Sequence, residues 1–282
     1  MRALIALAIP LVLLAPSTSG ATQHTAIYAH RGGADLAPEN TLGAFRQAHG
    51  MFPDVWLEMD VQLTADGVLV VIHDDTLDRT TDCTGDVIAH TAAEVAQCDA
   101  RDGWPDWPTV EPVPTFAQVL AEGKDAGWRL LVELKNIPGE ANFDPTGGAA
   151  AKMLIIDVEQ AGFPAADIAV QSFFPTSLDA IESARPDIAT ALLTTSQLPG
   201  APPGAGFPAV SGALYATARG YEISAPDHTA PDLSPETVQA MQALGRKVVV
   251  WTADEPVDIA RALTLGVDGI ISDRPDLVYN AL

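Results

Sequence analysis

Ionisable side chains recur in closely spaced pairs at the ends of short apolar runs in this sequence. Glu58 and Asp60 are two residues apart, and so are Glu133 and Lys135. Residues i and i+2 of a β-strand project from the same face, so each pair should face a single space. The spacing therefore predicts two strands that place charged groups together.

Carboxylates inside an apolar strand are costly to bury as charges unless a cation neutralises them. Glu58, Asp60 and Glu133 offer only hard oxygen ligands, which favours Mg²⁺ or Ca²⁺ over a structural zinc ion. We therefore expect these three residues to bind one divalent cation, Ca²⁺ or Mg²⁺. The alternative for Glu58 and Asp60 is a structural salt bridge to Arg31 or Lys135.

Two histidines lie where they could join this cluster. The Asp66-Gly67 pair is typical of a tight hairpin turn, which would return His73 to the side of Asp60. His30 ends the first apolar run, so the two imidazoles could act on one substrate as general acid and general base, in an order that the sequence leaves open. The remaining histidines are predicted to be surface residues: His24, His49, His90 and His228.

The charges of the cluster favour a phosphodiester substrate. Three carboxylates, the basic residues Arg31 and Lys135 and one divalent cation leave a single net positive charge, whereas without the cation the cluster would repel an anionic ester. Trp251 ends another apolar run and is either an apolar wall for the substrate or a core aromatic residue. The net charge of the whole chain is −22, which argues against nucleic acid or an anionic membrane surface as the main partner.

Short apolar runs alternate with helix-like stretches along most of the chain, which favours a parallel sheet. The third run is the return arm of the hairpin, so eight parallel strands remain, the number that a (β/α)8 TIM barrel needs. A doubly wound sheet is disfavoured because Arg31-Gly32-Gly33-Ala34 does not match its glycine-rich phosphate turn. The predicted strands are 26–30, 55–63, 68–73, 129–134, 168–173, 188–194, 221–224, 247–252 and 269–272; the predicted helices are 41–51, 115–126, 148–161, 176–184, 234–244 and 257–265; the predicted surface loops are 137–147 and 198–212.

The first 21 residues have the pattern of a cleaved export signal, with an apolar run at 3–15 and small residues before Ala21. That run is too short to cross a bilayer. We expect a barrel domain at 22–282 that is secreted or periplasmic and has no stable membrane anchor; the sequence does not indicate its oligomeric state. In an oxidising compartment Cys83 and Cys98 predict one disulfide, although two free thiols are the alternative.

Several ordered motifs resemble the glycerophosphodiester phosphodiesterase family. They run from Ala29 almost to the C-terminus and include Ala29-His30-Arg31-Gly32-Gly33, Pro38-Glu39-Asn40-Thr41, Leu57-Glu58-Met59-Asp60, His73-Asp74, Glu133-Leu134-Lys135, Gln171-Ser172-Phe173, Val250-Trp251-Thr252 and Ser272-Asp273-Arg274-Pro275. The family fold is a (β/α)8 barrel with an insertion after the His-Asp motif, which corresponds here to about 76–112. Mild departures from the family pattern are Met59, Ser272 and Ala253-Asp254.

The resemblance implies a role for each clustered residue: metal ligation by Glu58, Asp60 and Glu133, acid and base roles for His30 and His73, and phosphate contacts from Arg31 and Lys135. It implies hydrolysis of a small glycerophosphodiester to glycerol 3-phosphate and an alcohol, with water or the neighbouring glycerol hydroxyl as nucleophile. Trp251 is expected to line the substrate site. The alternatives are a phospholipase D-type enzyme acting on lysophospholipids or sphingolipids, and a secreted binding protein without catalysis.

Overall fold

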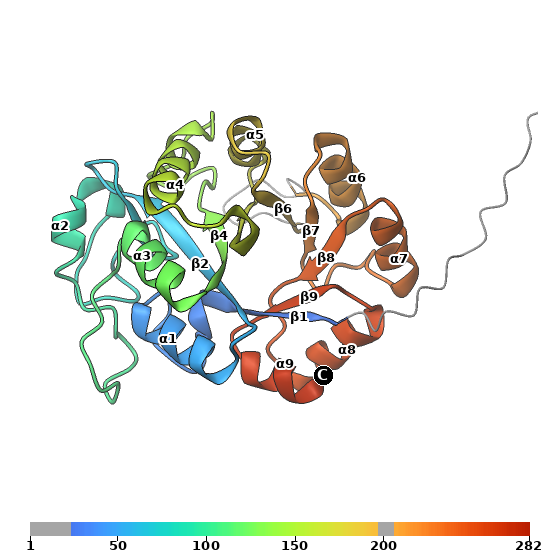
Figure 1. Ribbon diagram of the computed structural model, residues 1–282, viewed down its shortest axis with the longest axis horizontal. Coiled ribbons are helices and arrows are strands. Elements are labelled where there is room, and N and C mark those ends of the chain that lie inside the picture. The colour runs from blue at the N-terminus through green and yellow to red at the C-terminus, as the bar shows by residue number, and fades with distance from the viewer. Residues whose placement is uncertain (1–23, 197–205) are drawn as a thin grey trace, which may run out of the picture.

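The computed structural model describes residues 24–196 and 206–282. The predicted export signal, and most of the predicted loop at 198–212, lie outside the described residues. Strands form an inner ring and helices surround it (Figure 1). Within the described residues no helix combines the length and the apolar composition that crossing a membrane requires.

The predicted (β/α)8 barrel is confirmed. Eight parallel strands close into a ring through the pairing of the first with the second, and one further strand, β3, pairs antiparallel with β2 outside the ring. All nine predicted strands are present with small shifts at their ends. They are β1 (Ala26–Ala29), β2 (Trp56–Leu63), β3 (Leu69–Val71), β4 (Arg129–Leu134), β5 (Ile168–Ser172), β6 (Ala189–Thr194), β7 (Ile223–Pro226), β8 (Lys247–Val250) and β9 (Gly269–Ser272).

The six predicted helices are present as well, and side-chain caps fix several of their starts. Thr115 and Ser234 each form a reciprocal capping box with the residue three positions later, which satisfies free N–H groups of the first turn. The helices of the described residues are α1 (Leu42–Met51), α2 (Ala92–Val95), α3 (Phe116–Ala126), α4 (Gly148–Ala161), α5 (Pro175–Ala184), α6 (Ala209–Arg219), α7 (Pro235–Ala243), α8 (Pro256–Leu265) and α9 (Pro275–Ala281).

The prediction of a loop over all of 198–212 is wrong at its C-terminal end, because α6 begins at Ala209. The helix was not predicted because it is rich in small residues. Gly212 faces β6 so closely that a Cβ there would overlap the Thr194 side chain. The glycine is therefore a close-packing residue of a helix rather than part of a loop.

Successive side chains of each strand point alternately outward and inward, which produces two apolar layers. The larger layer lies between the barrel and its helices, whereas a small layer fills the barrel interior with side chains from seven strands. Above the small layer, towards the carboxyl ends of the strands, the inward positions become polar. The inner apolar layer consists of Tyr28, Leu131, Ala169, Ala191, Ile223, Val249 and Ile271.

The segment between β3 and α3 leaves the barrel on one side, where it carries α2 and a small apolar cluster of its own (Figure 1). The buried carboxylate of Glu111 ties it to the barrel: Glu111 accepts hydrogen bonds from Trp107 Nε1 at 3.0 Å and from the Gly43 amide, at the start of α1, at 3.1 Å. A carboxylate at a helix N-terminus is favoured by the helix dipole. Cys83 and Cys98 are bonded to each other within this segment.

The paired substitutions Cys83→Ser and Cys98→Ser are expected to lower the free energy of unfolding by about 3 kcal/mol, because the bridge closes a short loop of the unfolded chain. The bond joins residues 15 positions apart. Urea denaturation of the double variant and the wild type measures the loss. Equal denaturation midpoints would show that the bridge carries no stability.

Candidate active site

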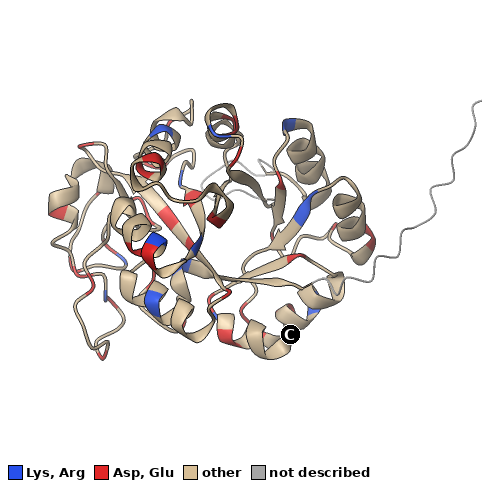
Figure 2. Ribbon diagram, viewed as in Figure 1, with Lys and Arg blue, Asp and Glu red and all other residues tan. Residues whose placement is uncertain are grey.

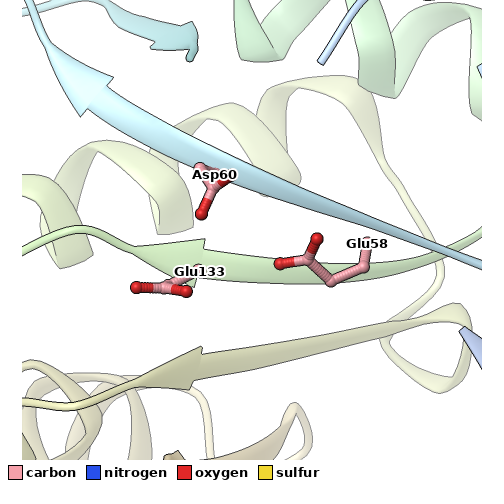
Figure 3. A group of neighbouring side chains, drawn as sticks. All are labelled: Glu58, Asp60 and Glu133. Carbon is pink, nitrogen blue, oxygen red and sulfur yellow. The ribbon is translucent and has the colours of Figure 1, made fainter. Parts of the chain in front are cut away.

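Three buried carboxylates meet inside the carboxyl end of the barrel. Glu58 and Asp60 come from β2 and Glu133 from β4, and all three point into one space (Figure 3). Asp60 lies beside Glu133 in the strand register, and ligand oxygens of the three side chains lie within 4.8 Å of one another. We call Glu58, Asp60 and Glu133 the acidic triad.

Neighbouring elements hold the triad with directed hydrogen bonds. Glu58 accepts from the Arg31 amide at 2.8 Å and from Gln171 Nε2 at 2.9 Å. Asp60 forms two hydrogen bonds with the Asn40 side chain. Asn40 Nδ2 donates to Asp60 Oδ2 at 3.0 Å, and Asn40 Oδ1 accepts from the Asp60 amide at 3.2 Å. The carboxylates are therefore fixed before any ligand arrives.

The turn after β1 explains the His-Arg-Gly-Gly sequence. Arg31 and the two glycines that follow all have positive φ, at 52°, 85° and 91°. Only glycine adopts this region without strain, and a Cβ on Gly32 would approach Ala44 Cβ to 2.7 Å. The turn aims the Arg31 amide at Glu58 and leaves His30 over the triad.

His30 lies between two carboxylates. Its Nδ1 lies 2.7 Å from Asp273 Oδ1 and its Nε2 lies 3.9 Å from Glu58 Oε2. Burial alone would lower the pKa of His30, but the charge of Glu58 and the hydrogen bond to Asp273 outweigh it and raise the pKa to about 9. The imidazole of the free protein is therefore protonated at neutral pH.

His73, in contrast to His30, lies between a carboxylate and an ammonium group. Its Nδ1 lies 2.6 Å from Asp74 Oδ1, and its Nε2 lies 3.1 Å from Lys135 Nζ. One ring nitrogen thus contacts a carboxylate and the other contacts an ammonium group. The hairpin delivers His73 to this position, since the Ile72 amide donates to the Asp60 carbonyl at 3.0 Å.

Two cations line the same space. Lys135 Nζ lies 3.0 Å from Glu133 Oε1 and 3.8 Å from Asp60 Oδ1, and Arg31 Nε lies 3.5 Å from Asp60 Oδ2. Burial would raise the pKa of Asp60, but His73, Lys135 and Arg31 together lower it well below its usual range. The pKa of Glu58 moves the other way, to about 8, because of burial and the neighbouring Asp60 charge.

A cavity of about 210 Å³ opens above these groups. The indole of Trp251 lies against Phe173 with ring centroids 5.3 Å apart, and its Nε1 donates to the Ala225 carbonyl. One wall of the cavity is thus aromatic and the floor is charged. Its lining consists of His30, Arg31, His73, Glu133, Lys135, Ile137, Glu140, Gln171, Phe173, Leu193, Trp251, Thr252 and Ile271.

The triad suits a divalent cation. Asp60 Oδ1 is buried and receives no hydrogen bond from the described residues, because Lys135 Nζ lies 3.8 Å away. Buried carboxylate oxygens without donors are oriented as ligands for a hard cation. Acidic residues are spread widely over the ribbon, but the triad places its charges inside the ring (Figure 2).

The structure brings together every residue that the sequence analysis placed at the site and adds others. Asp273 follows β9 directly, a position that could have drawn attention, whereas Arg79 bridges Glu39 and Asp74 from the inserted segment without any periodic signal. Glu140 joins the cavity from the loop after β4. The prediction that the other four histidines are surface residues holds only for His24; His49, His90 and His228 are half-buried.

Fold and site together define an enzyme of the (β/α)8 type, with its reactive groups at the carboxyl ends of the strands. Residues 30–277 match the model of the glycerophosphoryl diester phosphodiesterase family. A glycerophosphodiester phosphodiesterase of Caldanaerobacter subterraneus is 31% identical over 91% of this chain and 97% of its own length.

Solved structures agree with this assignment. A glycerophosphodiester phosphodiesterase from Agrobacterium tumefaciens superimposes with a TM-score of 0.70 at 28% identity, over 91% of this chain and all of that one. A phosphodiesterase from Oleispira antarctica, solved with its product sn-glycerol-3-phosphate, gives 0.76 at 26% identity over 91% of this chain and 96% of that one. The chain belongs to the glycerophosphodiester phosphodiesterase family.

Proposed function

We propose that this protein hydrolyses glycerophosphodiesters to glycerol 3-phosphate and an alcohol, with one divalent cation, Ca²⁺ or Mg²⁺, on the acidic triad. The observation that carries the proposal is the meeting of three carboxylates, two histidines and two cations around one cavity. The product bound by the Oleispira relative supports the same substrate class. The small cavity suits a glycerol phosphate better than a long acyl chain.

A bound cation would neutralise the triad and polarise a phosphoryl oxygen. Lys135 and Arg31 supply fixed positive charge beside it, where charge builds up on the phosphoryl group during the reaction. Trp251 and Phe173 provide an apolar wall for the organic part of the substrate.

The two histidines divide the proton transfers. His73 lines the cavity and is assigned as the base that activates the nucleophile, with Asp74 holding its Nδ1 and with Lys135 Nζ turning from its Nε2 to the phosphoryl group when substrate binds. His30 is protonated and is assigned as the acid that protonates the leaving alcohol, with Asp273 orienting it. The different partners of the two rings support this division of roles.

The direct test is release of glycerol 3-phosphate from glycerophosphocholine by the purified mature protein. We expect EDTA to abolish release and Ca²⁺ or Mg²⁺ to restore it. Cleavage of lysophosphatidylcholine but not of glycerophosphocholine would favour the phospholipase D-type reaction. No cleavage of either substrate with any metal would favour a binding protein.

The same proposal includes export and removal of residues 1–21, with the mature protein outside the cytoplasm and without a stable membrane anchor. The disulfide within the inserted segment supports an oxidising compartment. Mass spectrometry of the protein from the extracellular or periplasmic fraction would identify its N-terminus. A cytoplasmic chain that still begins at Met1 would contradict this part.

A further inference from the structure

Among the described residues that line the cavity, Glu140 is the one acidic residue that belongs neither to the acidic triad nor to a strand. It lies in the loop between β4 and α4 and is half-buried. Its Oε2 atom is buried without a hydrogen-bond partner among the described residues. A carboxylate held this way at a substrate cavity requires a partner.

The loop that carries Glu140 is held firmly. The Ala141 amide donates to Asp75 Oδ2 at 3.1 Å, and the Asn142 side chain donates to Gln62 Oε1. Phe143 packs edge-on against Phe174 with ring centroids 5.2 Å apart. The contacts of the three residues that follow Glu140 therefore fix its place at the cavity.

The charges around Glu140 do not supply its partner. Lys135 is the nearby cation, but it already contacts Glu133 and lies close to Asp60. Asp74 and Asp75 add further negative charge, and burial together with these carboxylates raises the pKa of Glu140 to about 7 despite Lys135. A second cation beside Glu140 would relieve this cost.

Glu140 also alters the charge balance of the cavity. With His30 protonated, the triad, Arg31, Lys135, His30 and a divalent cation leave two positive charges, and an ionised Glu140 removes one of them. Glu140 therefore weakens the attraction of the cavity for a diester whose only charge is its phosphate. A diester with a cationic headgroup offers Glu140 a positive charge of its own.

We propose that Glu140 selects glycerophosphodiesters whose leaving alcohol carries an ammonium group, as choline and ethanolamine do. Glu140 supplies the ionic contact, and the rings of Trp251 and Phe173 in the same cavity supply an aromatic surface that attracts ammonium ions. This inference rests on the proposed function and specifies its substrate class.

The test compares two diesters of glycerol 3-phosphate: the choline ester and the 3,3-dimethylbutyl ester, in which a carbon atom replaces the choline nitrogen. We expect the wild type to favour the choline ester by about tenfold in kcat/KM, the effect of one charged contact. Glu140→Gln should lower kcat/KM for the choline ester and raise it for the neutral ester, so that the preference for the choline ester is lost. Glu140→Lys should favour the neutral ester.

Glu159→Gln is the matched control, because Glu159 is an exposed glutamate on α4 away from the cavity; it should keep the wild-type ratio. Equal wild-type activity on both esters, or an equal loss on both in Glu140→Gln, would overturn the selection by Glu140 while leaving the hydrolysis intact. Release of glycerol 3-phosphate from neither ester by the wild type would instead overturn the proposed function, and this inference with it.

Discussion

His30→Ala is expected to lower kcat/KM for glycerophosphocholine by about 10²- to 10⁴-fold, the usual contribution of a general acid or base. Choline is a poor leaving group that needs a proton as the phosphorus–oxygen bond breaks. The protonated His30, held by Asp273 and Glu58, is placed to give it. A diester with a p-nitrophenol leaving group needs no such proton, so His30→Ala should recover most of its activity on that substrate.

His73→Ala provides the contrast. A missing base slows attack on both substrates, so the p-nitrophenyl diester should not rescue this variant. His24→Ala, which changes an exposed histidine, should match the wild type. Rescue of His73→Ala with no rescue of His30→Ala would reverse the two assignments.

Asp273→Asn tests the positioning of His30 separately. The amide keeps the size of the side chain but removes the charge that raises the pKa of His30. The alkaline limb of the pH–rate profile should therefore move to lower pH in this variant. An unmoved limb with a uniformly lower rate would mean that Asp273 acts only through structure.

Regular spacing allowed much of this arrangement to be predicted from sequence. The i, i+2 pairs on β2 and β4 face one space because strands alternate, and Asp66-Gly67 returns the chain because such pairs favour a tight turn. These rules are local. They therefore indicated the barrel, the clustered carboxylates and the placement of His73 without knowledge of any tertiary contact.

The parts that sequence did not predict depend on contacts between distant segments. Glu140 lies in a loop with no periodicity, and only the packing of that loop against Asp75 and Gln62 brings it to the cavity. Asp254 replaces a common family residue, yet it accepts hydrogen bonds from the Asp273 amide at 2.7 Å and from Ser272 Oγ at 3.1 Å. The substitution thus leaves the support of His30 in place.

Affinity for Ca²⁺ is expected to rise about tenfold per pH unit between pH 6 and pH 8. In the metal-free protein burial and the Asp60 charge raise the pKa of Glu58 to about 8. A cation on the triad must displace that proton, and each pH unit below 8 makes displacement tenfold harder. Calorimetric titration of EDTA-treated protein measures the slope.

The melting temperature of the metal-free protein should also depend on the protonation of Glu58. A carboxyl whose folded pKa lies above its unfolded value of 4.5 stabilises the fold at low pH and loses that contribution as the pH rises through about 8. His30 acts in the same direction, with its contribution lost as the pH rises through about 9. The metal-free protein should therefore melt at a lower temperature at pH 8 than at pH 6, and added Ca²⁺ should raise the melting temperature more at pH 8.

The Glu58→Gln variant tests whether Glu58 is the group that both binds the cation and releases the proton. Glutamine cannot hold the displaced proton, so this variant should bind Ca²⁺ more weakly and with a flatter dependence on pH, whereas Glu159→Gln should retain the wild-type slope. A wild-type affinity independent of pH would mean that the cation does not bind at Glu58. The triad would then act as a buried ion-pair network with Arg31 and Lys135, the structural alternative to a metal site.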